Sequence, residues 1–164
     1  MNESWRQRCN QIDDDATSAF LALCKRRNYG VTKSSRDDDM KRHIDFYVTR
    51  GNQTLKVELK GLKRLVDDGL FLIELRNVNG DAGWLYGEAD QVAFYLGNDR
   101  FLFCPLKTLR DMIDYLRKLH PVAFVNGYPS NAVFPKMYRR QDRPLEAITY
   151  VTTRFLLDRG AVYM

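Results

Sequence analysis

The feature that most constrains the fold of this chain is residues 43–60, where polar and apolar side chains alternate on both sides of Gly51-Asn52. A Gly-X pair between two alternating runs is typical of a β-hairpin with a two-residue turn. Such a turn fixes the register, so Asp45 is expected directly opposite Glu58. Because side chains alternate along a strand, one face of the hairpin is polar and the other apolar. The stretch therefore predicts a sheet with one face on a core.

The polar face of this hairpin carries two acids and a lysine close together. Facing carboxylates raise each other's pKa unless a cation lies between them. A hard divalent cation, Mg²⁺ with Mn²⁺ as its substitute, suits Asp45 and Glu58. Lys60 is placed to orient water or to stabilise a phosphate. The alternative is a solvent-facing strand pair with balanced charges. His43, expected opposite Lys60, is a candidate for proton transfer, although a hydrogen-bonding strand histidine is the more common case.

An acid on one strand followed by acid-x-lysine on the next resembles the signature of the PD-(D/E)XK nuclease superfamily. Asp45 and Glu58-Leu59-Lys60 match it, and Ile44 stands where the proline of the name would be. The resemblance covers about residues 13–119. It implies an α/β restriction-endonuclease-like core, with a mixed central β-sheet flanked by α-helices. Members of this size include phage and restriction endonucleases, junction resolvases and the cyanobacterial type of homing endonuclease, and the layout favours the last group.

The resemblance also implies roles for single residues. The metal ligands would be two carboxylates and a backbone carbonyl, with one lysine as the catalytic lysine: Asp45, Glu58, Leu59 and Lys60. Many members add an acid from the first helix, and the run at residues 13–15 is available, although capping of the helix explains that run equally well. Two further candidates could reach the site from other strands: Gln91, at the start of one strand, and Glu74, in a strand of its own.

The charge of the chain bears on its partner. The formal net charge is +5, and beside a metal-type acid pair this excess favours nucleic acid over an acidic metabolite. Seven basic residues from separate clusters are expected to contact double-stranded DNA: Lys33, Arg36, Lys63, Arg64, Arg139, Arg140 and Arg143. Each cluster alone is commonly a solvated surface. Because one chain offers one site, cutting both strands predicts a homo-oligomer, either a dimer or a tetramer.

Length and composition predict the domain organisation and the cellular setting. A chain of 164 residues is expected to form a single domain, with a basic C-terminal region at 120–164 that helps DNA contact or oligomerisation. No apolar run approaches a membrane span, and the first residues lack the apolar region of a signal peptide. The three cysteines are widely spaced and form no metal motif or disulfide framework. We therefore expect an intracellular, cytoplasmic protein with no membrane partner.

The hydrophobic pattern predicts the remaining elements. Helices are expected at 14–27, from Pro105 to about 120, and from Pro144, with a strand at 149–153 as the alternative to the last. Strands are expected at 42–50, 53–61, 69–76, 91–96 and 100–104. The nearly continuous apolar strand at 69–76 is expected to be buried on both faces. Residues 31–41 read as a loop whose acidic run, Asp37-Asp38-Asp39, is solvated.

Together these features predict a Mg²⁺-dependent endonuclease that hydrolyses DNA phosphodiester bonds, site-specific on duplex DNA and of the homing or restriction type. One alternative is a resolvase of the Holliday-junction type. Another is a basic nucleic-acid-binding protein without catalysis, in which the acid pair is structural. That alternative predicts salt-dependent binding that is insensitive to Mg²⁺ and gives no product.

Overall fold

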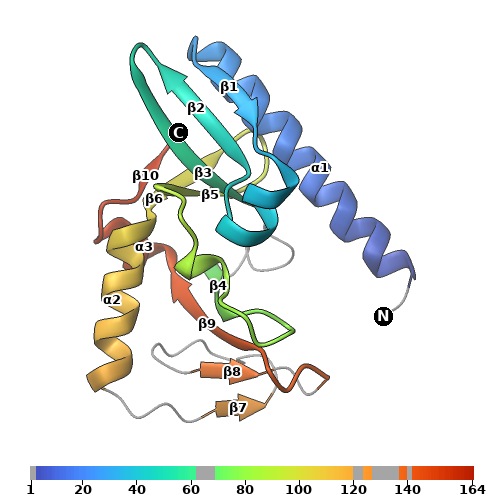
Figure 1. Cartoon of the computed structure of the whole chain (residues 1–164), viewed down its shortest axis with the longest axis vertical. Helices are drawn as coiled ribbons and strands as arrows, with labels where there is room; N and C mark the ends of the chain where they lie inside the picture. The colour runs from blue at the N-terminus through green and yellow to red at the C-terminus, as the bar shows by residue number, and fades with distance from the viewer. Residues whose placement is uncertain (1–2, 62–68, 120–123, 127–136, 140–141) are drawn as a thin grey trace.

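The chain combines two β-sheets with helices on their faces (Figure 1). A computed structural model describes residues 3–61, 69–119, 124–126, 137–139 and 142–164. One sheet has six strands in the order β1-β2-β3-β5-β6-β10, and the other has four in the order β4-β9-β8-β7. In the first sheet β3 runs parallel to β5 while its other pairs are antiparallel. The expected class, an α/β fold with a mixed sheet flanked by helices, is confirmed.

The six-stranded sheet contains the predicted hairpin and the predicted strands at 91–96 and 100–104, which pair with each other. Its strands are β1 (Gly30–Lys33), β2 (Phe46–Arg50), β3 (Gln53–Gly61), β5 (Gln91–Tyr95), β6 (Phe101–Pro105) and β10 (Val162–Tyr163). The ladder between β2 and β3 runs from the pair Phe46 and Val57 to the pair Arg50 and Gln53, which is the predicted register. Gly51 has φ +57°, a left-handed conformation that glycine adopts without a steric penalty. The turn therefore sets the pairing, as expected.

One face of this sheet is covered by α1 (Glu3–Arg26). The ring of Phe20 lies 5.1 Å from that of Phe46 and 5.9 Å from that of Phe101, so the helix packs on the apolar face of the hairpin. The helix begins at Glu3, well before the predicted residue 14. Within the residues that the structure describes, no helix is both long and apolar enough to cross a bilayer.

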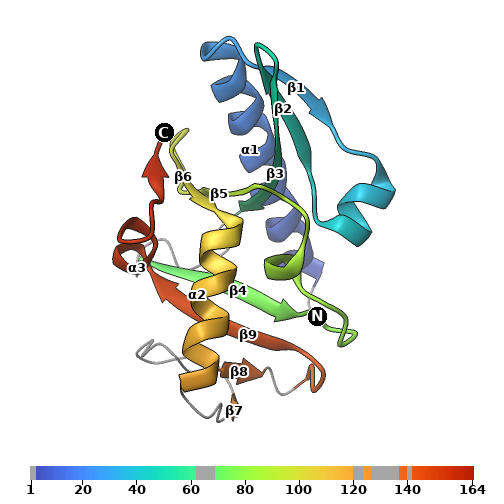
Figure 2. The same ribbon diagram turned by 60° about the vertical axis from the view of Figure 1, so that its left-hand side comes forward.

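The opposite face of the sheet packs on the second sheet and on α2 (Leu106–Leu119). That sheet consists of β4 (Leu70–Arg76), β7 (Phe124–Asn126), β8 (Met137–Arg139) and β9 (Ala147–Thr152). Figure 2 shows α2 crossing in front of β4 and β9. Phe71 of β4, Phe94 of β5 and Val151 of β9 belong to the same buried cluster. The strands after residue 119 therefore share the core of the strands before it.

Several elements differ from the prediction. The segment after Pro144 forms β9 followed by the short α3 (Thr153–Leu157), so the strand alternative is correct; β-branched residues favour it. β4 is an edge strand with alternate residues buried, not a central strand buried on both faces. The predicted loop at 31–41 contains most of β1 and the start of a π-helix, η1 (Asp38–Arg42). Pro105 ends β6, and the helix begins at the next residue.

Candidate active site

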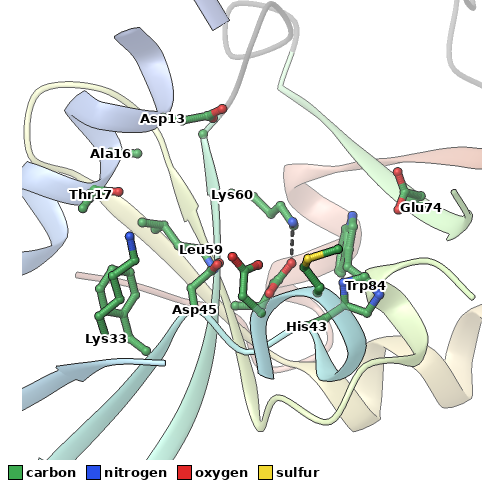
Figure 3. A pocket seen from close by; sticks show the side chains of 15 residues that line it. Asp13, Ala16, Thr17, Lys33, His43, Asp45, Leu59, Lys60, Glu74 and Trp84 are labelled. Carbon is green, nitrogen blue, oxygen red and sulfur yellow. Dashed lines mark hydrogen bonds and ion pairs between the residues drawn. The ribbon is translucent and has the colours of Figure 1, made fainter. Parts of the chain in front are cut away.

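A polar cleft of about 510 Å³ lies where the end of β3 meets α1, β1, β4 and the start of β2 (Figure 3). Five acidic side chains and two lysines line it: Asp13, Asp39, Asp45, Glu58, Glu74, Lys33 and Lys60. Asp45, Glu58 and Lys60, which the hairpin register predicts to be neighbours, therefore open on one cavity.

Asp45 lies directly before β2, at the point where the regular ladder ends. Its backbone N–H donates to the carbonyl of Val57 at 2.9 Å. Because Val57 is already the ladder partner of Phe46, Asp45 is out of regular register, and the prediction that it directly faces Glu58 is wrong. The carboxylate compensates by accepting a hydrogen bond from the backbone N–H of Leu59, with Oδ2 2.7 Å from the nitrogen. The acid is thus held beside β3 by its side chain.

The ionisation of Asp45 is perturbed by its surroundings. Burial raises the pKa of Asp45 to about 7, and the nearby charge of Glu58 adds to the shift. The charge of Lys60 and the hydrogen bond from Leu59 oppose it. Carboxyl groups with such raised pKa values concentrate at functional sites, and a bound cation would favour the charged form.

Glu58 is the most buried acid of the cleft. Its side chain is 3% exposed, and Oε1 pairs with Nζ of Lys60, as the dashed line in Figure 3 marks. Oε2 is buried and has no hydrogen-bond partner among the described residues. A buried carboxylate oxygen without a partner is costly and calls for a donor or a cation. Burial lowers the pKa of Lys60, but the charges of Glu58 and Asp45 outweigh it, so the pKa is raised and the amine stays charged.

The donor set of this cleft fits a hard divalent cation. The N–H and the C=O of a strand residue point to the same edge, so the carbonyl of Leu59 faces the edge that Asp45 occupies. Two carboxylates and a carbonyl are oxygen donors of the type that Mg²⁺ takes. Among the described residues, no three His, Cys, Asp or Glu side chains form a metal-holding group by themselves. Carbonyl oxygen and water would therefore have to complete the coordination.

The structure selects one member of the acidic run in α1. Asp13 lines the cleft, whereas Asp14 and Asp15 do not. A Cβ atom on Gly61 would lie 2.8 Å from Oδ1 of Asp13, so the helix closely approaches the end of β3 at this position. Asp15 instead accepts a hydrogen bond from the side chain of Gln11 at 2.9 Å. The helical spacing of the run leaves this choice open, because the helix rotation depends on packing.

Gln91 does not reach the cleft, and its prediction as a catalytic residue is corrected. It pairs with Val57 across β3 and β5, and paired residues point to the same face of a sheet. Glu58, the next residue on β3, therefore points to the opposite face. Gln91 lines a second, largely apolar cavity of about 300 Å³ together with Phe20 and Cys24.

Two cleft residues come from η1, a segment predicted as a solvated loop. Asp39 lines the cleft close enough to Asp45 for its charge to contribute to the raised pKa of Asp45. Met40, beside it, is 65% exposed. His43 ends the helix with φ +53°, and its Nε2 lies 3.3 Å from the carbonyl oxygen of Ala82. It lines the cleft but is not in β2, so its predicted pairing with Lys60 is wrong.

Two further residues complete the wall opposite Asp45. Glu74, a candidate from the sequence, lines the cleft from β4. Trp84 begins η2 (Trp84–Tyr86) and is 3% exposed, and the centre of its ring lies 5.6 Å from Nζ of Lys60. The burial of this tryptophan indicates a packing role, and its ring also borders the lysine.

The residues predicted to bind DNA fall into different environments. Lys33 lines the cleft, and Arg36 is exposed next to η1. Arg143 is half-buried, with Nη1 3.8 Å from Oε1 of the fully buried Glu146 and Nε 3.9 Å from Oδ2 of the exposed Asp142. Arg139 is partly buried. Three of the predicted residues lie outside the described part of the chain: Lys63, Arg64 and Arg140.

The fold and the cleft together define a mixed α/β protein with an acid-rich site at the end of a hairpin. No family model matches the chain, and no curated protein matches it. Among solved structures the chain is similar to a bacterial homing endonuclease, I-Ssp6803I, with a TM-score of 0.39 and 20% sequence identity over 57% of this chain. The match spans 62% of the length of that endonuclease.

Proposed function

We propose that the protein is a Mg²⁺-dependent endonuclease that hydrolyses phosphodiester bonds of double-stranded DNA in the cleft of Asp45, Glu58 and Lys60. The observation that carries the proposal is the meeting of these three side chains in one cavity, with Oε2 of Glu58 buried and lacking a described partner. A buried charged oxygen without a donor is rarely kept for stability alone.

The residues that would hold the cation are Asp45, Glu58 and the backbone carbonyl of Leu59, and Mn²⁺ is expected to substitute for Mg²⁺. When bound, the cation would supply positive charge that neutralises the phosphate and makes water more acidic. The hydrogen bond from Leu59 to Asp45 fixes the carboxylate in place before any ligand arrives. Such preorganisation avoids the cost of ordering the acid during the reaction.

Lys60 carries a positive charge that suits a role next to the reacting phosphate. Its amine stays positively charged, because the neighbouring carboxylates raise its pKa. A charged amine in the cleft donates hydrogen bonds to the attacking water or to a phosphate oxygen as negative charge grows there. Hydrolysis joins the water oxygen to phosphorus and releases one deoxyribose oxygen, which leaves with a proton from solvent.

The charge of the cleft supports a cation-dependent mode of DNA binding. Five carboxylates face two lysines there, although the whole chain has a formal net charge of +5. A phosphate backbone would be repelled from such a cleft unless divalent cations entered with it. Lys33 also lines the cleft, and its amine would contact a neighbouring phosphate. We further propose that the protein acts at a specific site on duplex DNA, as homing or restriction enzymes do. We also propose that it assembles into a dimer or a tetramer.

One observation favours a second candidate, a nucleic-acid-binding protein without catalysis. Glu58 and Lys60 form an ion pair in which the acid is almost fully buried, and such pairs occur as structural features. In that case the cleft needs no cation, and DNA affinity depends on salt but not on Mg²⁺. A resolvase differs from a site-specific endonuclease only in substrate, so the same assay separates all three.

The test is incubation of the protein with supercoiled plasmid, a four-way junction and single strands, in Mg²⁺, Mn²⁺ or EDTA. We expect products from duplex DNA with either cation and none in EDTA. Glu58→Gln should abolish cleavage. Glu88→Gln is the matched control, because Glu88 is an exposed acid that pairs with Arg42 outside the cleft. DNA binding without product in every condition would overturn the endonuclease, and preferential cutting of the junction would reassign it as a resolvase.

A further inference from the structure

Lys60 and a divalent cation would compete for the same carboxylate. Nζ of Lys60 is paired with Oε1 of Glu58, whose side chain is 3% exposed. A cation on Glu58 would place further positive charge next to this amine, in a poorly hydrated place where charges interact strongly. Lys60 therefore needs a second negatively charged partner if Glu58 is to bind a cation without a large electrostatic penalty.

Glu74 is the acid that the fold supplies on the other side of the amine. It lines the same cleft from β4, and Figure 3 shows Lys60 between Asp45 and Glu74. Its charge is close enough to Lys60 to contribute to the raised pKa of the amine. Lys60 is part of the six-stranded sheet and Glu74 part of the four-stranded sheet, so the two sheets meet across this pair.

Glu74 is held in position by Gly83. A Cβ atom on Gly83 would overlap the backbone carbonyl of Glu74 and lie 2.8 Å from its Cγ, so only glycine allows this approach. The N–H of Gly83 donates to the carbonyl of Leu75 at 2.9 Å, which fixes the same segment to β4. Trp84 follows directly, with its ring centre 5.6 Å from Nζ of Lys60. An aromatic face at this distance attracts a lysine amine.

We propose, building on the function above, that Glu74 is a positioning residue that receives the amine of Lys60 when Glu58 binds a divalent cation, with Trp84 beside the amine in both positions. Lys60 then stays in the cleft as a charged group next to the reacting phosphate. Without Glu74, the amine of Lys60 would have no second partner and would stay beside Glu58, where its positive charge would weaken cation binding.

A double-mutant cycle on cation affinity tests this proposal without DNA. Mg²⁺ is titrated calorimetrically into the wild-type protein, Glu74→Gln, Lys60→Met and the double variant. We expect Glu74→Gln to weaken Mg²⁺ binding roughly tenfold when Lys60 is present, and at most about twofold in the Lys60→Met background, where no amine needs a second partner. The rise in melting temperature with Mg²⁺ gives a second readout of the same coupling, and Glu88→Gln should leave both readouts unchanged.

Equal losses in both backgrounds would make Glu74 a direct cation ligand, and no loss in either would make it a bystander; both results overturn the proposal. The proposed nuclease function is tested by a separate result, the cleavage of DNA. If the coupling is found but no DNA is cut, the endonuclease is wrong and the exchange of partners stands. If DNA is cut with Mg²⁺ and the coupling is absent, only the exchange is wrong.

Discussion

Asp45 accepts a hydrogen bond from the backbone N–H of Leu59, with 2.7 Å between Oδ2 and the nitrogen. The side chain takes the place that a continuing β2 strand would have filled, because the regular ladder ends at Phe46. The end of one strand thus leaves an edge of β3 free, and an acid occupies it next to the carbonyl of Leu59. This relationship accounts for how a hairpin becomes a candidate cation site.

The raised pKa of Asp45 makes the stability of the cation-free protein depend on pH. The folded value of about 7 lies above the ordinary 3.8, so the folded state binds the proton more tightly than the unfolded state. The stability that the protonated Asp45 contributes to the folded state is fully present below pH 3.8 and is lost as the pH rises through 7. Asp45→Asn removes the ionisable group and with it the cost of burying a charged carboxylate at high pH. In EDTA we expect the variant to gain roughly 3–4 kcal/mol over the wild type between pH 4 and 8.

Urea unfolding of both proteins across that pH range measures this difference. At pH 8, Mg²⁺ should stabilise the wild type and leave Asp45→Asn almost unchanged, because the variant lacks a charged ligand. A difference between the two proteins that does not vary with pH would mean that Asp45 titrates as an ordinary carboxyl group.

Phe20 anchors α1 on the apolar face of the hairpin. It is 1% exposed and contacts the rings of Phe46 and Phe101. Phe20→Ala should lower the free energy of unfolding by about 3–5 kcal/mol, because it leaves a cavity in the core. Leu21→Ala is the control, since Leu21 is 40% exposed on the same helix, and it should cost less than about 1 kcal/mol. Similar losses for the two variants in chemical denaturation would contradict this packing.

Two glycines should respond to alanine for different reasons. At Gly83 the new Cβ would overlap the backbone of Glu74, whereas at Gly51 it would meet open space but a φ of +57°. Left-handed strain at Gly51 should cost roughly 1–2 kcal/mol. We expect the backbone collision at Gly83 to cost more and to displace Trp84, so the emission of that tryptophan should shift only in Gly83→Ala. A larger loss for Gly51→Ala would contradict the approach of Gly83 to β4.

Lys33 and Arg143 were both predicted to bind DNA, and the structure separates them. Lys33 lines the cleft, so Lys33→Ala should weaken DNA binding and reduce the salt dependence of affinity by about one unit of slope. Arg143→Ala removes a partner from the buried Glu146 and should instead cost about 1–3 kcal/mol of stability, with little change in affinity. Affinity measured against salt concentration, with Ca²⁺ in place of Mg²⁺, distinguishes the two roles. The reverse pattern would make Arg143 the DNA contact.

The hairpin is the part of the fold that local sequence determines most fully. A Gly-X turn between alternating strands specifies both register and faces, and the ladder from Phe46 and Val57 to Arg50 and Gln53 follows it. Local rules do not say where a ladder stops. Alternation predicts pairing as far as His43 and Lys60, but the ladder stops at Phe46, and His43 belongs to the end of a π-helix.

The rest of the site depends on contacts between distant segments. Gln91 points away because β5 runs parallel to β3 and pairs with it through Val57, a relation that neither strand encodes alone. Asp39 enters the cleft because η1 folds over β2, with Asp38 accepting hydrogen bonds from Tyr47 and Arg42. The edge position of β4 likewise follows from its partner β9, whose sequence is far away in the chain.

The most direct test of a cation site at Asp45 and Glu58 is a crystal of the protein grown with Mn²⁺ and measured for anomalous scattering. The account predicts a peak at about 2.0–2.6 Å from a carboxylate oxygen of Asp45, Oε2 of Glu58 and the carbonyl oxygen of Leu59. Glu58→Gln crystals treated in the same way should lose it. A cleft without a peak at millimolar Mn²⁺, or a peak that touches neither Asp45 nor Glu58, would contradict the account.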